Sequence, residues 1–196
     1  MLPTDSYGAH IAFPPRVFIR RVALYESFSI GAKIREIPFK RGLNLIVGDD
    51  AEGQEGNLGG HSAGKTTLCR LIRHCLGEEN FATAEEEDAI RENFPHGYVG
   101  CEVVINGAPW AVLIPFNRTS KSFPLAAREE TLESLFDLEK KDNDYQRYLL
   151  ELENIIPSSD GLHWKHLLSW LTRDQECIQG TYWACGSGAR HSGISL

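Results

Sequence analysis

The chain has 196 residues, of which 42% are hydrophobic and 24% are charged, as in an ordinary globular protein with one sizeable domain. Its formal net charge of −7 argues against a free-standing nucleic-acid-binding protein, while still allowing a local basic face. There is no apolar run of membrane-spanning length and no signal-peptide pattern, so we expect a cytoplasmic protein with no membrane partner. The five cysteines form no C-x-x-C pair and are expected to be reduced thiols.

The first part of the chain predicts the edge of a sheet. Prolines and glycine in residues 1–15 indicate a flexible lead-in. Alternating apolar residues predict one strand over 17–24 and a second strand over 33–39. After a turn, the apolar run over 43–48 predicts a third strand, short and buried, that leads toward a glycine-rich stretch.

Residues 59–66 fit the pattern G-x-x-x-x-G-K-[ST], which is typical of the phosphate-binding loop of nucleotide-binding proteins. Glycines let the backbone turn its N–H groups inward around an anion. Lys65 is expected to reach the β- and γ-phosphates of ATP, and the Thr66 hydroxyl is expected to bind Mg²⁺. The predicted nucleotide-contacting residues are Gly59, Gly60, His61, Ser62, Ala63, Gly64, Lys65, Thr66 and Thr67.

The sequence on both sides of the loop strengthens this interpretation. Apolar residues spaced as on one helix face follow the loop from Leu68 to Leu76, with Arg70 and Arg73 off that face. Gly77 is a suitable residue to end this helix. Residues 49–58 separate the strand from the loop and predict an acidic, flexible insertion.

A β-hairpin gives the clearest strand signal in the middle of the chain. Apolar residues alternate over 99–105 and again over 110–116, with one face expected to be buried. Asn106-Gly107 between them is the residue pair most typical of a tight two-residue turn. Before the hairpin, the acidic run 85–88 predicts a solvated surface.

The remaining segments are less regular. A short helical turn is predicted over 89–94, and a polar, exposed connector over 117–127. One or two helices are predicted over 131–156, and another short helix over 162–171. Residues 178–196 lose all periodicity and gain glycine and serine, which predicts an unpatterned tail.

This order of features resembles the N-terminal lobe of the ATPase heads of the SMC, Rad50 and RecN group, a branch of the ABC ATPases. The resemblance covers about residues 16–177. It implies an α/β fold: a P-loop NTPase lobe with a mixed sheet, an antiparallel hairpin and flanking helices. In that family a glutamine that closes the lobe contacts Mg²⁺ and the attacking water. Gln175, in the sequence R-D-Q-E, occupies the matching place and is the implied catalytic residue and second metal ligand.

The chain also departs from that family. It contains no apolar run ending in Asp-Glu and no family-type signature motif, which in this group belong to a C-terminal lobe. We therefore expect an incomplete head, either truncated, frameshifted near Cys177 or one half of a split head. The implied partners are a C-terminal ATPase lobe or a second head and, through the assembled complex, DNA. The implied setting is DNA repair, maintenance or defence, with hydrolysis dependent on the missing lobe.

Two other functions fit the same loop. The first is a self-contained P-loop kinase or NTPase, in which Arg118 and Arg128 are the candidates for an arginine lid. A GTPase is disfavoured because no Asn-Lys-x-Asp sequence follows the loop. The second is a non-catalytic module that binds nucleotide and interacts with other proteins.

Overall fold

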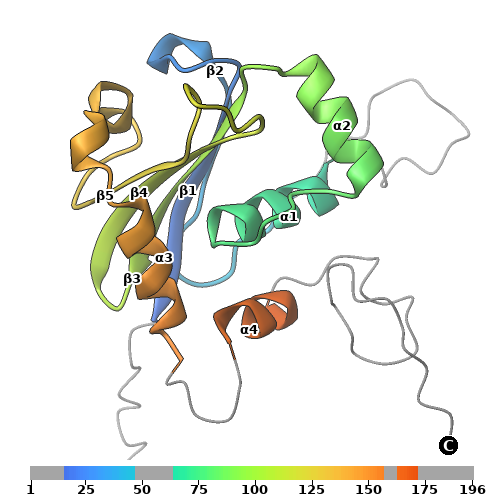
Figure 1. The fold of residues 1–196 in the computed structure, drawn as a ribbon. Helices are drawn as coiled ribbons and strands as arrows, with labels where there is room; N and C mark the ends of the chain where they lie inside the picture. The colour runs from blue at the N-terminus through green and yellow to red at the C-terminus, as the bar shows by residue number, and fades with distance from the viewer. Residues whose placement is uncertain (1–15, 47–63, 157–162, 172–196) are drawn as a thin grey trace, which may run out of the picture.

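The computed structural model describes residues 16–46, 64–156 and 163–171. They form an α/β fold built on one five-stranded sheet with the strand order β2-β1-β3-β4-β5 (Figure 1). The strands are β1 (Val17–Tyr25), β2 (Lys33–Pro38), β3 (Tyr98–Ile105), β4 (Ala108–Pro115) and β5 (Leu125–Arg128). The helices are α1 (Lys65–Cys75), α2 (Ala84–Asn93), α3 (Tyr145–Glu153) and α4 (Trp164–Leu171), with short 3-10 turns η1 (Ile30–Ala32), η2 (Ser134–Asp137) and η3 (Lys140–Asp142).

The two faces of the sheet carry separate apolar clusters. Side chains of α1, α3 and α4 pack with alternate strand residues such as Cys101 and Val112 on the first face. The intervening residues, such as Ala111 and Leu113, pack against the segment around η2 on the second face. Because successive strand side chains point to opposite faces, the two central strands contribute to both clusters.

Every strand pairing in the described part of the chain is antiparallel. The mixed sheet expected from the resemblance is therefore wrong for these residues. The strand predicted over 43–48 is also not found over its described part, residues 43–46, which lie outside any strand. Leu43 and Leu45 are 96% and 82% exposed, and this apolar run pairs with none of the described strands.

The hairpin is confirmed. Asn106 and Gly107 have φ angles of 48° and 88°, the left-handed values that the tight turn between β3 and β4 requires. The prediction that only one face is buried is wrong, because β4 is buried on both faces from Trp110 onward. On the second face Gly100 lies against the Leu132 side chain, where a Cβ atom at residue 100 would come within 2.8 Å of it.

The acidic run 85–88 is part of helix α2, which begins earlier than the turn predicted over 89–94. Thr83 and Glu86 form a reciprocal capping box that fixes this start. The interpretation of the whole run as solvated surface is wrong for Glu87, which is 6% exposed and accepts the Phe81 N–H at 2.7 Å. Glu86 and Glu87 of the acidic run therefore stabilise the fold, Glu86 by capping α2 and Glu87 by bonding the Phe81 N–H.

Two later predictions need correction and one is confirmed. The connector predicted over 117–127 ends in strand β5, which pairs with β4. The helices predicted over 131–156 are two 3-10 turns and the single helix α3. Helix α4 confirms the prediction over 162–171 within its described residues. The lead-in 1–15, the insertion 49–58 and the tail 178–196 lie outside the described residues.

Candidate functional site

Helix α1 begins where the phosphate-loop motif predicts that a helix should begin. Gly64 is the N-cap residue and has a φ of 68°, in the left-handed region that favours glycine. The first helical hydrogen bond runs from the Leu68 N–H to the Gly64 carbonyl oxygen, at 2.9 Å. The three N–H groups of residues 65–67 precede this first donor, so helix geometry gives them no partner within α1. Among the described residues, no side chain caps this end.

The structure describes only part of the predicted site. Gly64, Lys65, Thr66 and Thr67 lie together at the start of α1, where Thr66 is half-buried and Thr67 is exposed. Gly59, Gly60, His61, Ser62, Ala63 and Gln175 lie outside the described residues. Because Gln175 is not described, the joint binding of Mg²⁺ by Thr66 and Gln175 stays a prediction.

The predicted apolar face of α1 is confirmed, and buried residues extend further around the helix than predicted. Leu71 and Cys75 are buried as expected. Arg70, predicted to lie off this face, is only 7% exposed. Its Nη1 atom donates to Glu86 Oε2 at 2.5 Å, which joins α1 to the start of α2. Arg73 forms an ion pair with Glu78 just beyond the helix end.

The C-terminal end of α1 is held by side chains from distant parts of the chain. Tyr148 Oη donates to the Cys75 carbonyl oxygen at 2.7 Å, and Trp164 Nε1 donates to the Leu76 carbonyl oxygen at 2.9 Å. Gly77 ends the helix, as predicted, with a φ of 97°. The Glu78 N–H then bonds back to the Arg73 carbonyl oxygen at 3.0 Å, in a Schellman arrangement. The C-terminal carbonyls of α1 thus have donors, whereas the first three N–H groups have no partner within the helix.

His74 lies in the last turn of α1 and is 3% exposed. Its Nδ1 atom lies 2.8 Å from the Glu78 carbonyl oxygen, while Nε2 has no hydrogen-bond partner among the described residues. Burial lowers the pKa of His74 to about 4, because removal from water disfavours the charged ring. The neutral imidazole therefore donates its Nδ1 proton to that carbonyl and carries no charge near neutral pH.

A cluster of charged side chains joins the second face of the sheet to the segment around η2. Arg21 of β1 donates to Glu133 at 2.5 Å and to Glu102 at 2.6 Å, and Glu36 lies 3.4 Å from its Nη1 atom. Glu102 also accepts the Leu132 N–H at 3.0 Å. These contacts raise the pKa of Arg21 and lower the pKa of Glu133.

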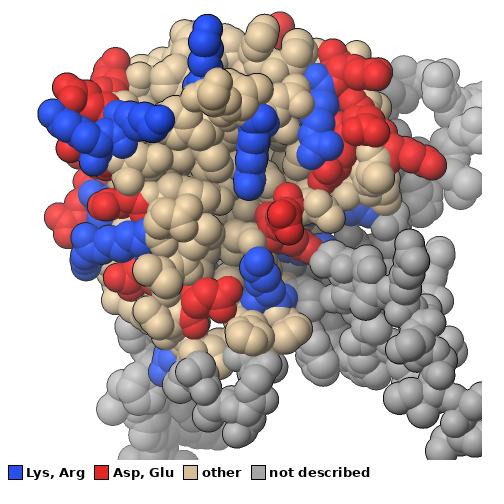
Figure 2. All heavy atoms as spheres, in the orientation of Figure 1, with Lys and Arg blue, Asp and Glu red and all other residues tan. Residues whose placement is uncertain are grey.

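That cluster is structural and does not form a metal centre. Within the described ranges no group of three or more His, Cys, Asp or Glu side chains could hold a metal ion. Figure 2 shows basic and acidic side chains mixed over much of the visible face, with acidic side chains gathered at its upper right and no broad basic area. The visible surface therefore offers no extended basic footprint for a nucleic acid.

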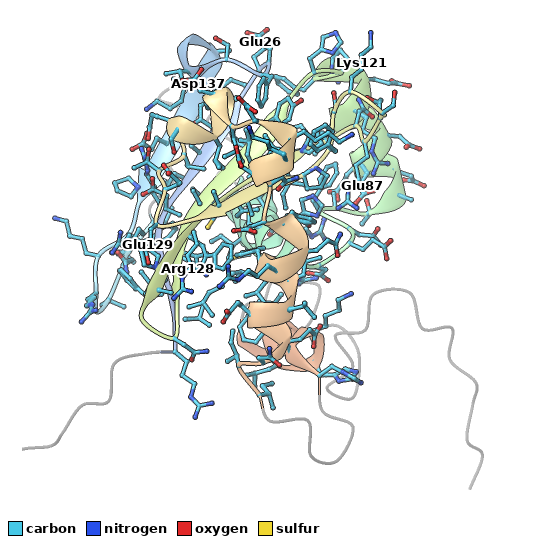
Figure 3. All side chains as sticks on the ribbon, turned by 60° about the vertical axis from the view of Figure 1, so that its left-hand side comes forward. Glu26, Glu87, Lys121, Arg128, Glu129 and Asp137 are labelled. Carbon is cyan, nitrogen blue, oxygen red and sulfur yellow. The ribbon has the colours of Figure 1, made fainter. Side chains whose placement is uncertain are left out.

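The two arginines considered for a kinase-type lid lie away from the start of α1. Besides burial, the charge of Arg118 lowers the pKa of His74, which lies in the last turn of α1 at the opposite end of the helix. Arg128 ends strand β5 beside Glu129, with the two charged groups 4.0 Å apart (Figure 3). Neither position favours contact with phosphates bound at residues 64–67.

No known protein family, curated protein sequence or solved structure matches this chain. None of the helices within the described ranges is both long enough and apolar enough to cross a membrane. The functional assignment therefore depends on the chain's own residues, above all on residues 59–67 and the helix that follows them.

Proposed function

We propose that this chain is the ATP-binding N-terminal lobe of an SMC- or Rad50-like ATPase, with Mg²⁺ as cofactor. The observation that supports this most is the start of α1, which begins at Lys65 of the motif with Gly64 in a left-handed conformation. A phosphate-binding loop requires this transition from glycine-rich backbone to helix at its lysine. In this proposal residues 59–64 surround the phosphates, Lys65 neutralises the terminal phosphates and Thr66 binds the metal.

The position of α1 also suits anion binding. Its first three N–H groups have no helical partner, and the aligned peptide dipoles add partial positive charge at this end. The opposite end is fixed by Tyr148, Trp164 and the Schellman arrangement at Gly77. A helix held at one end keeps its other end in place, which reduces the entropy lost when a phosphate binds.

Hydrolysis, in this proposal, requires a C-terminal lobe or a second head. Phosphoryl transfer to water needs a charge clamp, a metal and a positioned water. The motif supplies the clamp and the resemblance assigns Gln175 to the metal and the water, whereas no carboxylate of the Walker B type is present in the sequence. A C-terminal lobe or a second head is the proposed partner, and DNA repair, maintenance or defence is the proposed setting.

Isothermal titration calorimetry of the whole chain with ATP and Mg²⁺ tests the binding step. We expect Lys65→Ala to abolish binding, because it removes the mobile charge that neutralises the terminal phosphates. Lys141→Ala is the matched control, since Lys141 is a 73% exposed lysine on η3. Thr66→Ala should weaken only the Mg²⁺-dependent part of the binding. Equal affinity in the wild type and Lys65→Ala, with both folded by circular dichroism, would refute the nucleotide site.

A phosphate-release assay tests the need for a partner. The chain alone should bind ATP with negligible hydrolysis, since loss of a water-positioning group costs orders of magnitude in rate. A cognate C-terminal lobe should restore turnover, and Gln175→Ala should then lower turnover but not binding. Robust hydrolysis by the isolated chain that Lys65→Ala abolishes would favour a self-contained enzyme. Binding that never leads to turnover, even with the partner, would favour a non-catalytic module.

A further inference from the structure

A cavity of about 460 Å³ lies at the end of α1 opposite to the phosphate-loop motif. Its walls come from the start of β1, the turn after β2, the C-cap of α1 and helix α4. Its volume is within the range of small-molecule sites in proteins. The eleven residues of α1 separate its Leu76 wall from the N-terminal end of the helix by about 16 Å, so the cavity is distinct from the proposed nucleotide site.

Most of the cavity wall is apolar. The side chains that form it include Phe18, Ile19, Phe39, Leu76, Trp164 and Leu168. The one polar atom of the Trp164 ring, Nε1, is already bonded to the Leu76 carbonyl oxygen at 2.9 Å. An apolar ligand surface is therefore favoured against this wall, because a polar group placed there would lose its water without gaining a partner.

The polar part of the lining comes from the single turn 40–44. Asn44 fixes this turn, since its Oδ1 accepts the Lys40 N–H at 2.8 Å and its Nδ2 donates to the Lys40 carbonyl oxygen at 2.7 Å. Lys40 and Arg41 are both exposed, and the Arg41 guanidinium lies 5.8 Å from the centre of the Phe18 ring. None of the acidic side chains in the described part of the chain forms an ion pair with either cation.

Two cations beside an apolar cavity, with no acidic partner among the described residues, indicate which chemistry a ligand needs. The ligand needs an apolar body to cover the wall and one anionic group at the end that faces the turn 40–44. A carboxylate suits the pair best, since an arginine can hold both of its oxygens and a lysine adds a second charged donor. None of the described residues that line the cavity is acidic, so none of them repels such a group.

We propose that this cavity binds a small amphipathic carboxylate, with its apolar body against Trp164 and Leu168 and its carboxylate between Lys40 and Arg41. The site is independent of the proposed nucleotide site, so Lys65→Ala should leave it unchanged. Occupation by such a ligand would link the turn after β2 to helix α4 and to the end of α1.

Calorimetry of the whole chain with octanoate tests this proposal, with octanol and octylammonium as neutral and cationic probes of the same chain length. We expect saturable one-to-one binding of octanoate and much weaker binding of the other two. Removing both cations in Lys40→Gln/Arg41→Gln should weaken octanoate binding about tenfold, as expected for lost charge-assisted hydrogen bonds. The control Arg20→Gln/Arg35→Gln removes two exposed cations that do not line the cavity and should bind like the wild type.

Three results would overturn the proposal. The first is the absence of saturable octanoate binding by the folded wild type. The second is equal affinity for octanoate and octanol, or equal affinity of the two double variants, which would mean that the charges play no part. The third is a dimer in sedimentation that Leu168→Asp dissociates, since the cavity would then accommodate a second copy of the chain.

Discussion

The Tyr148 hydroxyl donates a hydrogen bond of 2.7 Å to the carbonyl oxygen of Cys75 and thereby joins α3 to the last turn of α1. Both residues are fully buried. A carbonyl in the last turn of a helix has no helical partner, and burial removes the water that would otherwise bind it. Trp164 performs the same task for the next carbonyl, that of Leu76. The anchored end of α1 therefore depends on two aromatic side chains far along the chain.

Tyr148→Phe should lower the free energy of unfolding by about 1–3 kcal/mol, because it leaves a buried carbonyl without a donor. Urea unfolding followed by circular dichroism gives this value. Tyr25→Phe is the matched control, since Tyr25 is 1% exposed and its hydroxyl has no partner among the described residues. Removal of the Tyr25 hydroxyl should leave the free energy of unfolding unchanged or raise it. Equal destabilisation by the two variants would contradict the special role of the Tyr148 bond.

Arg21→Gln should destabilise the protein by about 2–4 kcal/mol, because it leaves the Glu102 and Glu133 carboxylates close together without their shared cation. The Arg21 side chain is 18% exposed, which keeps the expected cost below that of a fully buried pair. Arg35→Gln, at an exposed position of β2, should change stability by less than about 0.5 kcal/mol. A loss in Arg21→Gln as small as in this control would show that the cluster contributes little.

His74 should make stability depend on pH between its unfolded and folded pKa values. Burial lowers the pKa of His74 from an ordinary 6.5 to about 4, so the unfolded chain binds a proton in this range that the folded protein does not. Stability should therefore fall by about 3 kcal/mol as the pH drops from 6.5 to 4. His74→Gln should flatten this slope, whereas His96→Gln, at an exposed position, should not. Parallel slopes in all three proteins would contradict the assignment.

Glu133 and Glu36 should make stability depend on pH in a range that extends below that of His74. Hydrogen bonds from Arg21 lower the pKa of Glu133, and a hydrogen bond from Lys33 lowers the pKa of Glu36. A carboxylate with a lowered pKa stabilises the fold above its unfolded pKa, and this stability is lost as the pH falls through the folded value. We expect a second loss of stability below about pH 4.5. Thermal unfolding at pH 4.5 and below should show a smaller loss in Arg21→Gln than in the wild type.

Local sequence signals predicted the elements that local chemistry determines. The tight turn at residues 106 and 107 requires left-handed backbone, which Asn106-Gly107 adopts readily. This residue pair is therefore a strong local signal for a hairpin. The glycine-to-lysine transition at residues 64–65 and the apolar face that follows predicted α1 with nearly its observed bounds. The start of α2 had an equally local signal, the Thr83 and Glu86 capping box, which the charge of the run 85–88 obscured.

Elements that depend on distant partners were not predictable in this way. Strand β5 is only four residues long, and Asn143 holds it by accepting the Ala126 N–H at 3.0 Å. The run 43–46 has the composition of a buried strand but lies exposed, since composition does not supply the strand beside it. The side chains that bond the end of α1 lie 73 and 88 residues beyond the carbonyl groups that they cap, too far for any local pattern.

Those separations along the sequence also delay the capping of α1 while the protein is being synthesised. Ribosomes add roughly 5–20 residues each second. The interval between synthesis of Leu76 and synthesis of Trp164, whose indole bonds the Leu76 carbonyl oxygen, is therefore on the order of ten seconds. During this interval water must bind the last carbonyls of α1, and the apolar face of the helix lacks α3 and α4. Closing so long a loop is slow, and a nascent chain with that much exposed apolar surface is a substrate for chaperones. A pause in translation just before residue 164 would therefore prolong the period in which the nascent chain is most prone to aggregate.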